Sequence, residues 1–307
     1  MSILEIKEKN FVSAVVYLHN EADQAEPFVA ALAQQLESHF EHYEIVAVND
    51  GCTDQTVQRF KQAVQQWSNA PLTILNMSLH HGLEQAMNAG LDAAIGDFVY
   101  EFDRLQMAYG PQLIWQAYQT ALEGVDVVTV SPTSQQLTSR AFYQIFNAFS
   151  NSAYRLESDA FRLVSRRAIN RVKAISENLH YRKAAYAASG LACKTIHFEG
   201  RAPKRTGARL DQAVESLALY TDAGYKISFG ISCAMAVLTL AALVYTVLVW
   251  LLGEPVTGWT TTMLVLSGGL AGLFVILTIA IKYLSLLVGL VFRKQDYLIE
   301  GIEKLQR

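Results

Sequence analysis

The chain has 307 residues, of which 51% are hydrophobic and only 17% are charged, and its formal net charge is -3. Soluble domains carry about 25% charged residues, and the deficit here is concentrated between Ile227 and Ile281, where Glu254 is the one charged side chain. These values exclude a wholly soluble protein, and the sequence has no basic cluster that would indicate a nucleic-acid partner.

Short β-rich runs alternate with helical stretches over the first hundred residues. The runs are Phe11–Leu18, Tyr43–Val48, Leu72–Met77 and Phe98–Phe102. This alternation is typical of βαβ units, so we expect an α/β fold with a mostly parallel sheet. Ligands of such sheets bind outside the carboxyl ends of the strands. The residues that follow each strand are therefore the first candidates for a site.

Polar residues follow three of these strands. Glu21 comes after the first strand, Asn49 and Asp50 after the second, and Asp103 after the fourth. The amide and carboxylate oxygens of Asn49 and Asp50 suit a nucleobase or a ribose, and we expect Asp50 to contact a ligand. Asp54 is expected instead to cap the helix that follows it.

The middle of the chain carries four further patterns. Leu137–Tyr154 is rich in aromatic residues and has a helical period, Phe161–Ile169 is a basic segment, and Lys194–Phe198 reads as a strand. Apolar residues then recur at helical spacing just before the long apolar region. They predict an amphipathic helix over residues 210–228 that lies in a membrane interface.

Two apolar runs near the C-terminus cover residues 229–252 and 263–281. At about 1.5 Å per helical residue, each is long enough to cross roughly 30 Å of hydrocarbon. A buried hairpin of core helices is the alternative, but runs of this length with almost no charge rarely form one. We therefore expect two transmembrane helices joined by a periplasmic loop over residues 253–262.

Lysine and arginine flank the two runs and are missing from the loop between them: Lys226 lies before the first run, and Lys282, Arg293 and Lys294 lie after the second. This asymmetry places both termini in the cytoplasm. The first ten residues lack the apolar core of a signal peptide. We expect a cytoplasmic domain over residues 1–209, a cytoplasmic C-terminal helix over residues 282–307, and an inner-membrane location.

The motifs taken together resemble one family. In order, they are Val15 to Glu21, Val48 to Asp54, Gly82 to Gly90, Gly96-Asp97 and Asp103. Their order and spacing resemble family 2 glycosyltransferases, which have a nucleotide-sugar-binding, Rossmann-like GT-A fold. Leu137 to Tyr143, Phe161 to Arg167 and the two terminal spans look like the polyprenyl-phosphate glycosyltransferases, relatives of dolichol-phosphate mannose synthase.

The resemblance implies a reaction. A sugar would pass, with inversion, from a nucleotide sugar to undecaprenyl or dolichyl phosphate at the cytoplasmic face of the membrane. A UDP sugar is favoured over a GDP sugar as the donor. The lipid-linked product would serve later glycosylation of cell-envelope polysaccharide across the membrane. The resemblance also implies a homotetramer that contacts membrane lipids.

The family places an Asp-x-Asp pair at the end of the fourth strand to hold Mg²⁺ or Mn²⁺, because a diphosphate leaving group needs its developing charge neutralised. Asp103 matches the first Asp, Leu105 stands at the second position, and Gln106 follows much as a Gln does in the family. Glu101 lies on the same strand face as Asp103 and is the alternative second carboxylate. Asp103 with Gln106 and substrate phosphates is the simpler metal site.

The resemblance assigns further roles by position. Glu21, Asn49 and Asp50 would hold the nucleotide. Asp103 would be catalytic together with Asp159. The family has an aspartate close to the acceptor phosphate where Ala160 stands here, and Asp159 or Glu157 is the nearest candidate to replace it.

Phosphate binding would fall to basic residues of the second half, namely Arg162, Lys204, Arg205 and Arg209. Lys204, Arg205 and Arg209 lie near the predicted interface helix. Attraction to anionic lipid is therefore an alternative reason for this basic group.

Two functions remain open at this point. The loss of the second metal aspartate and of several expected cations also fits a catalytically inactive, membrane-anchored binding or assembly subunit. The groups that recognise sugar hydroxyls lie in loops, so the pattern identifies no sugar.

Overall fold

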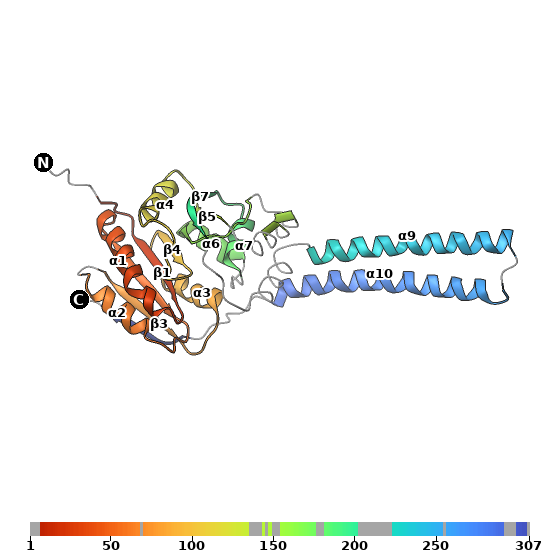
Figure 1. Cartoon of the computed structure of the whole chain (residues 1–307), viewed down its shortest axis with the longest axis horizontal. Helices are drawn as coiled ribbons and strands as arrows, with labels where there is room; N and C mark the ends of the chain where they lie inside the picture. Colours follow the sequence, from red (N-terminus) through yellow and green to blue (C-terminus); the bar gives the residue numbers. More distant parts are fainter. Residues whose placement is uncertain are drawn as a thin grey trace. The chain divides into compact units, whose positions relative to one another are not determined.

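The computed structural model describes residues 7–67, 70–134, 143–144, 147–148, 154–175, 181–201, 223–253, 256–291 and 299–305. The contacts within the chain divide it into two units (Figure 1). The first contains Met1–Arg209 and Arg293–Arg307, and the second contains Leu210–Phe292.

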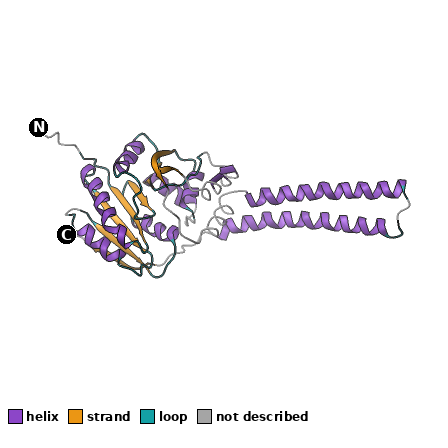
Figure 2. Cartoon of the chain, in the orientation of Figure 1, coloured by secondary structure: helices purple, strands orange, loops and turns teal. Residues whose placement is uncertain are grey.

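A mostly parallel sheet forms the first unit (Figure 2), with the described strands in the order β7-β5-β6-β4-β1-β2-β3-β8. Strand β6 runs antiparallel to β4 and β5, and β8 runs antiparallel to β3. The other described neighbours are parallel. The strands are β1 (Val12–Leu18), β2 (Tyr43–Asn49), β3 (Leu72–Met77), β4 (Phe98–Phe102), β5 (Val127–Ser134), β6 (Phe161–Ser165), β7 (Cys193–Arg201) and β8 (Ile299–Leu305).

The sequence-based expectations for the first four strands are confirmed to within one residue at each end. Their runs are β-rich, and each is followed by a helix long enough to return the chain to the start of the next strand. The segment read as basic, Phe161–Ile169, is β6 followed by the start of a helix.

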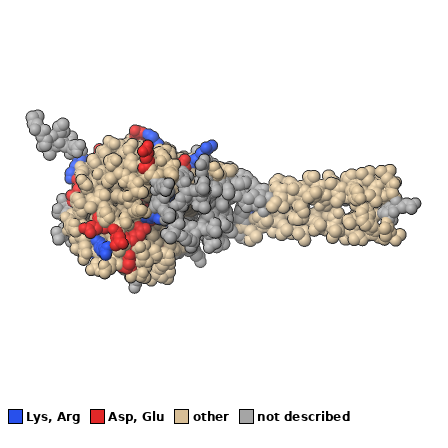
Figure 3. Space-filling view, viewed as in Figure 1, with Lys and Arg blue, Asp and Glu red and all other residues tan. Residues whose placement is uncertain are grey.

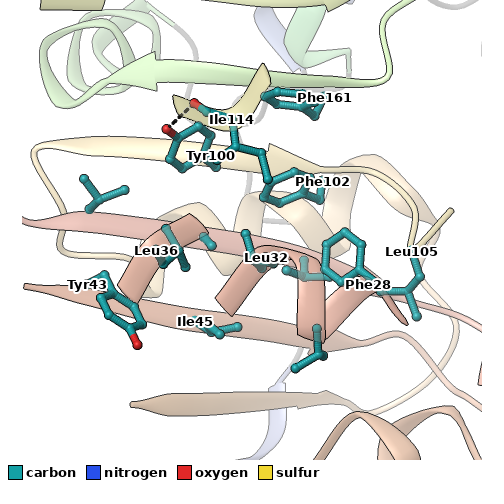
Figure 4. Packing of buried hydrophobic residues seen from close by; sticks show 14 of the residues in the cluster. Phe28, Leu32, Leu36, Tyr43, Ile45, Tyr100, Phe102, Leu105, Ile114 and Phe161 are labelled. Carbon is teal, nitrogen blue, oxygen red and sulfur yellow. Dashed lines mark hydrogen bonds between the residues drawn. The ribbon is translucent and has the colours of Figure 1, made fainter. Parts of the chain in front are cut away.

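Three helices and one face of the sheet enclose the main core (Figure 4): α1 (Ala22–His39), α2 (Thr56–Gln65) and α4 (Gln112–Leu122). Phe28 of α1 meets Phe102 of β4 edge-on, with ring centres 5.3 Å apart. Tyr100 is fully buried and donates its hydroxyl to the carbonyl oxygen of Ile114 at 2.7 Å. The core thus holds the carboxyl end of β4 in a fixed position.

Helix α3 (Leu83–Ala93) packs against the sheet at Val15 and Val48, from which a Cβ atom built at Gly90 would be only 2.4 and 2.8 Å away. This close approach requires glycine, and it brings the first turn of α3 to the carboxyl ends of the strands. Helices α6 (Arg166–Ile175) and α7 (Arg182–Ala188) also belong to this unit.

The C-terminal segment differs from the prediction of a helix over residues 282–307. Helix α10 ends at Val291, and residues 299–305 form β8, which pairs with the edge strand β3. The physical reason is that β3 would otherwise leave its backbone N–H and C=O groups without a strand partner on one side. Pairing with β8 satisfies those groups.

The second unit consists of α9 (Ala223–Leu252) and α10 (Trp259–Val291), which contact each other. Phe229–Leu252 and Trp259–Leu284 are long and apolar enough to cross a membrane, and few of their side chains are buried. In the view of Figure 3 this unit is uncharged along most of its length, whereas charged side chains are spread over the first unit.

Several predicted segments lie outside the described residues. They are most of Leu137–Tyr154 and the interface helix over 210–228, except for its last six residues, which form the start of α9.

Candidate active site

Asp50 follows β2 and is fully buried, with its carboxylate engaged by the loop before α3. Oδ1 accepts the backbone N–H of His81 at 2.7 Å, and Oδ2 accepts that of Gly82 and the hydroxyl of Tyr17, each at 2.9 Å. Nδ1 of His80 lies 3.0 Å from Oδ2. In this structure Asp50 therefore holds the loop before α3 in place. The contact with a ligand that we expect for Asp50 stays a prediction.

Two imidazole rings lie next to Asp50. The ring centres of His19 and His80 are 4.4 Å apart, and the Nδ1 atoms of both rings lie within 3.3 Å of the Asp50 carbonyl oxygen. The side chain of His80 is 56% exposed. The pair forms a partly exposed aromatic surface at the carboxyl ends of β1 and β2.

Asn49 ends β2, and both of its amide atoms have protein partners. Oδ1 accepts the N–H of Cys52 at 3.0 Å, and Nδ2 donates to Asn76 Oδ1 at 2.9 Å. Asn76 in turn donates to Glu303 Oε1 of β8 at 3.0 Å. A chain of hydrogen bonds thus links the C-terminal strand to the loop after β2.

Glu21 and Asp54 join neighbouring strand ends. Glu21 Oε2 accepts the N–H of Leu105 at 2.8 Å and so connects the end of β1 to the loop after β4. Asp54 Oδ1 accepts the N–H of Thr56, the first residue of α2, at 2.9 Å. Asp54 therefore serves the start of that helix as predicted, although Gln55 occupies the N-cap position.

A group of charged side chains gathers where β4 and β6 meet α3 and α7. We refer to it as the arginine-carboxylate cluster, and its described members are Glu84, Glu101, Asp103, Asp159, Arg162, Arg182 and Lys183. Side chains that are far apart in the sequence meet here because Glu101 and Arg162 lie opposite each other on paired strands.

Arg162 is the centre of the cluster, with a side chain only 2% exposed. Its Nη1 donates to Glu101 Oε2 at 2.9 Å, its Nη2 to Asp103 Oδ2 at 2.8 Å, and its Nε to Asp159 Oδ2 at 3.0 Å. The guanidinium is thus committed to three carboxylates, and the phosphate-binding role expected for Arg162 stays a prediction.

Arg182 opens α7 and is fully buried. Its Nε donates to Glu101 Oε2 at 3.0 Å and its Nη2 to Asp103 Oδ1 at 2.6 Å. The hydroxyl of Tyr186 donates to Glu101 Oε1 at 2.6 Å, and Lys183 forms an ion pair with Asp159. The four oxygens of Glu101 and Asp103 therefore each accept at least one hydrogen bond.

The electrostatics of the cluster follow from burial and mutual pairing. Burial acts to lower the pKa of Arg162, but Asp159 and Asp103 outweigh it and hold that pKa well above its ordinary value. Burial acts to raise the pKa of Asp159, and Arg162 and Lys183 outweigh it, so this pKa is lowered. At Glu84 burial outweighs the attraction of Arg182, and the pKa of this carboxyl is raised. Asp159 therefore stays ionised at neutral pH.

The expected Mg²⁺ or Mn²⁺ site does not fit these side chains as they lie. Cation ligation needs carboxylate oxygens directed at the ion, whereas the oxygens of Glu101 and Asp103 are directed at two guanidinium groups and a hydroxyl. No group of three or more His, Cys, Asp or Glu residues that could hold a metal occurs in the described part of the chain. Gln106 lies in the loop after β4 and is exposed.

The structure brings together Glu101, Asp103, Asp159 and Arg162 from the predicted set. Glu21, Asn49 and Asp50 lie at neighbouring strand ends, and the predicted phosphate-binding residues Lys204, Arg205 and Arg209 lie outside the described residues.

Sequence reasoning missed Glu84, Arg182, Lys183 and Tyr186. An Arg-Lys pair at the start of an otherwise alanine-rich helix, nearly all of which is buried, is the signal that could have indicated a paired internal charge.

The model of the family described as glycosyl transferase family 2 matches residues 13–171, just over half of the chain. Among curated relatives, an uncharacterized glycosyltransferase of Synechocystis sp. is 30% identical over 203 residues, which cover 64% of this chain and 63% of the relative. The prophage bactoprenol glucosyl transferase homolog of Escherichia coli is 30% identical over 54% of this chain and 56% of its own length. The chain thus spans less than two thirds of either relative.

Among solved structures, glucosyl-3-phosphoglycerate synthase from Mycobacterium tuberculosis has a TM-score of 0.51 and 15% identity, covering 68% of this chain and 78% of the synthase. The same synthase in complex with Mn²⁺, UDP-glucose and phosphoglyceric acid has a TM-score of 0.50. This likeness shows that the first unit has a GT-A-like α/β fold. The family match runs from β1 through β6 to the start of α6 and covers just over half of the chain, so the chain belongs to glycosyl transferase family 2.

Proposed function

We propose that this protein transfers a sugar, with inversion, from a nucleotide sugar to a polyprenyl phosphate at a membrane surface. A UDP sugar is the favoured donor, and undecaprenyl or dolichyl phosphate is the acceptor. The observation that carries the proposal is the family 2 domain followed in one chain by two helices long and apolar enough to cross a membrane. An acceptor that resides in the lipid phase needs an enzyme held at that phase.

The names of relatives support this acceptor class. One relative is a bactoprenol glucosyl transferase homolog, and another, from Edwardsiella ictaluri, is an undecaprenyl-phosphate 4-deoxy-4-formamido-L-arabinose transferase that is 28% identical over 40% of this chain. The lysine and arginine residues that flank the apolar runs support a cytoplasmic domain with both termini cytoplasmic.

The donor is proposed to bind at the carboxyl ends of β1, β2 and β4. The ring pair of His19 and His80 offers a surface on which a base could stack. Asp103 directly follows β4 at the same edge of the sheet, and its side chain is 20% exposed. Asp50 and Glu21 hold the loops that would carry the donor by accepting hydrogen bonds from their backbone N–H groups.

The chemistry needs no strong general base. A lipid phosphate is ionised at neutral pH and can attack the anomeric carbon directly, while the bond from that carbon to the nucleoside diphosphate breaks. Attack on the face opposite the leaving group inverts the sugar. Asp159 is paired with Arg162 and Lys183 and is only 3% exposed, so its role is to hold these cations. No step is assigned to a divalent ion, since Glu101 and Asp103 do not fit one.

The test is a transfer assay on the purified full chain in detergent, supplied with undecaprenyl phosphate and one UDP or GDP sugar at a time. Formation of a lipid-linked sugar, detected by thin-layer chromatography and mass spectrometry, is the expected result. Binding of a nucleotide sugar without transfer would favour the second candidate, a membrane-anchored binding or assembly subunit. That candidate is favoured by the commitment of Arg162 and both site carboxylates to one another.

A further inference from the structure

We infer that Arg162 and Arg182 are the permanent counter-charges of Glu101 and Asp103, and that the protein binds a nucleoside diphosphate sugar with no divalent ion at these carboxylates. The part that concerns the donor rests on the proposed function. The part that concerns the ion depends on the arginine-carboxylate cluster alone.

The first reason is that the cluster leaves no place for an ion. Oδ1 of Asp103 lies 2.6 Å from Nη2 of Arg182, and Oδ2 lies 2.8 Å from Nη2 of Arg162. Glu101 Oε2 lies 2.9 and 3.0 Å from nitrogen atoms of the same two arginines. An ion bound to either carboxylate would be a near neighbour of two guanidinium charges, whose repulsion opposes its binding.

The second reason is that the two arginines cannot easily leave. Their side chains are 2% and 0% exposed, so displacing them would bury two cations without partners. Arg162 is placed by the register of β6 against β4, directly opposite Glu101. Arg182 is held at the start of α7, where its backbone N–H donates to Glu84 at 3.1 Å. Two separate elements thus fix the two guanidinium groups.

The third reason is the balance of charge. The cluster contains four carboxylates and three cations, so the arginines and the lysine offset most of the negative charge at the end of β4. Without these cations, Asp103 and its neighbours would repel a diphosphate. The guanidinium pair therefore removes most of the repulsion that these carboxylates would exert on a diphosphate.

The experiment measures Mn²⁺ bound to the full chain in detergent by electron paramagnetic resonance, with UDP present and with a sample of UDP and Mn²⁺ without protein as background. Wild type is compared with Asp103→Asn. Equal Mn²⁺ binding by the two proteins is the expected result. Binding of one Mn²⁺ per chain in wild type that Asp103→Asn abolishes would overturn the proposal.

A second variant tests whether the guanidinium groups are what prevents Mn²⁺ from binding to these carboxylates. Arg182→Met removes one guanidinium from Asp103 and Glu101 and should raise Mn²⁺ affinity at least about tenfold, because the opposing charge is reduced. Arg167→Met is the matched control, since this arginine is exposed and pairs with Asp126 outside the cluster. An Arg182→Met protein that stays folded by circular dichroism and gains no Mn²⁺ affinity over Arg167→Met would also overturn the proposal.

The donor is tested separately by calorimetry with UDP-glucose in excess EDTA and in Mn²⁺. Dissociation constants that agree within about twofold are expected. Binding that requires Mn²⁺ and is lost in Asp103→Asn would contradict the inference. If UDP-glucose and the other nucleotide sugars bind under neither condition, the proposed function fails, while the comparison of Mn²⁺ binding still decides on the cluster.

Discussion

The ends of β2 and β4 each carry an aspartate, Asp50 fully buried and Asp103 with a side chain that is 20% exposed, and the two carboxylates are neutralised in different ways. Asp50 is held by two backbone N–H groups, a tyrosine hydroxyl and an imidazole of adjoining segments. Asp103 is held by two buried guanidinium groups that come from β6 and α7. The first carboxylate shapes a loop, whereas the second takes part in a network of full charges.

The difference matters because substitution of a partner should affect the stability of the two regions to different extents. Loss of a partner from a hydrogen-bonded carboxylate leaves one polar group unsatisfied. Loss of one cation from a buried ionic network leaves several charges without compensation. The region around β4 should therefore be the more sensitive of the two to substitution.

The largest effect is expected for Arg162→Met. Three carboxylates lose a partner at once, and the free energy of unfolding should fall by about 3–5 kcal/mol. Denaturant titration of the detergent-solubilised chain, followed by the circular dichroism of the first unit, measures this fall. Arg167→Met, whose side chain is 72% exposed, should cost less than about 1 kcal/mol. Equal losses in the two variants would refute the account of the cluster.

A smaller effect is expected for Asp50→Asn. One carboxylate oxygen is replaced by an amide NH₂ group, which cannot accept the hydrogen bonds that the oxygen received. The free energy of unfolding should therefore fall by about 1–3 kcal/mol. Binding of UDP-glucose should weaken as the loop before α3 loosens. Asp23→Asn is the control, because Asp23 is 91% exposed on α1. If Asp50→Asn leaves both stability and binding at the level of Asp23→Asn, Asp50 does not hold the loop.

Acid should destabilise the β4 region in a predictable direction. The pKa of Asp159 is lower in the folded protein than the value of about 3.9 in an unfolded chain, because Arg162 and Lys183 outweigh burial. Its contribution is therefore complete above about pH 3.9 and is lost as the pH falls through the lower folded pKa. As the pH falls below about 5, the free energy of unfolding should decrease less steeply in Asp159→Asn than in wild type. Parallel curves for the two proteins would contradict the pairing.

The smallest effect is expected at β8. Glu303 pairs with Lys61 and accepts a hydrogen bond from Asn76, but its side chain is 47% exposed. Glu303→Gln should cost less than about 1 kcal/mol, measured by the same denaturant titration. A loss as large as that of Arg162→Met would mean that the link from β8 to Asn49 carries much more of the stability than exposure suggests.

The sequence predicts the first four strands and both long apolar helices well, because each depends on a local pattern of residue types. It predicts which strand ends carry polar residues for the same reason. Arg182 could not be assigned to Glu101 in this way, since 81 positions separate them and no local period relates α7 to β4. Strand β8 was missed because a glycine interrupts its short run and its partner, β3, lies more than two hundred residues earlier.

The most direct test of the account is transfer from a radiolabelled UDP sugar to undecaprenyl phosphate by the full chain in excess EDTA. Because guanidinium groups neutralise Glu101 and Asp103, the account predicts a lipid-linked sugar at a rate within about twofold of that in Mn²⁺. A product that forms in Mn²⁺ and disappears in EDTA would contradict it.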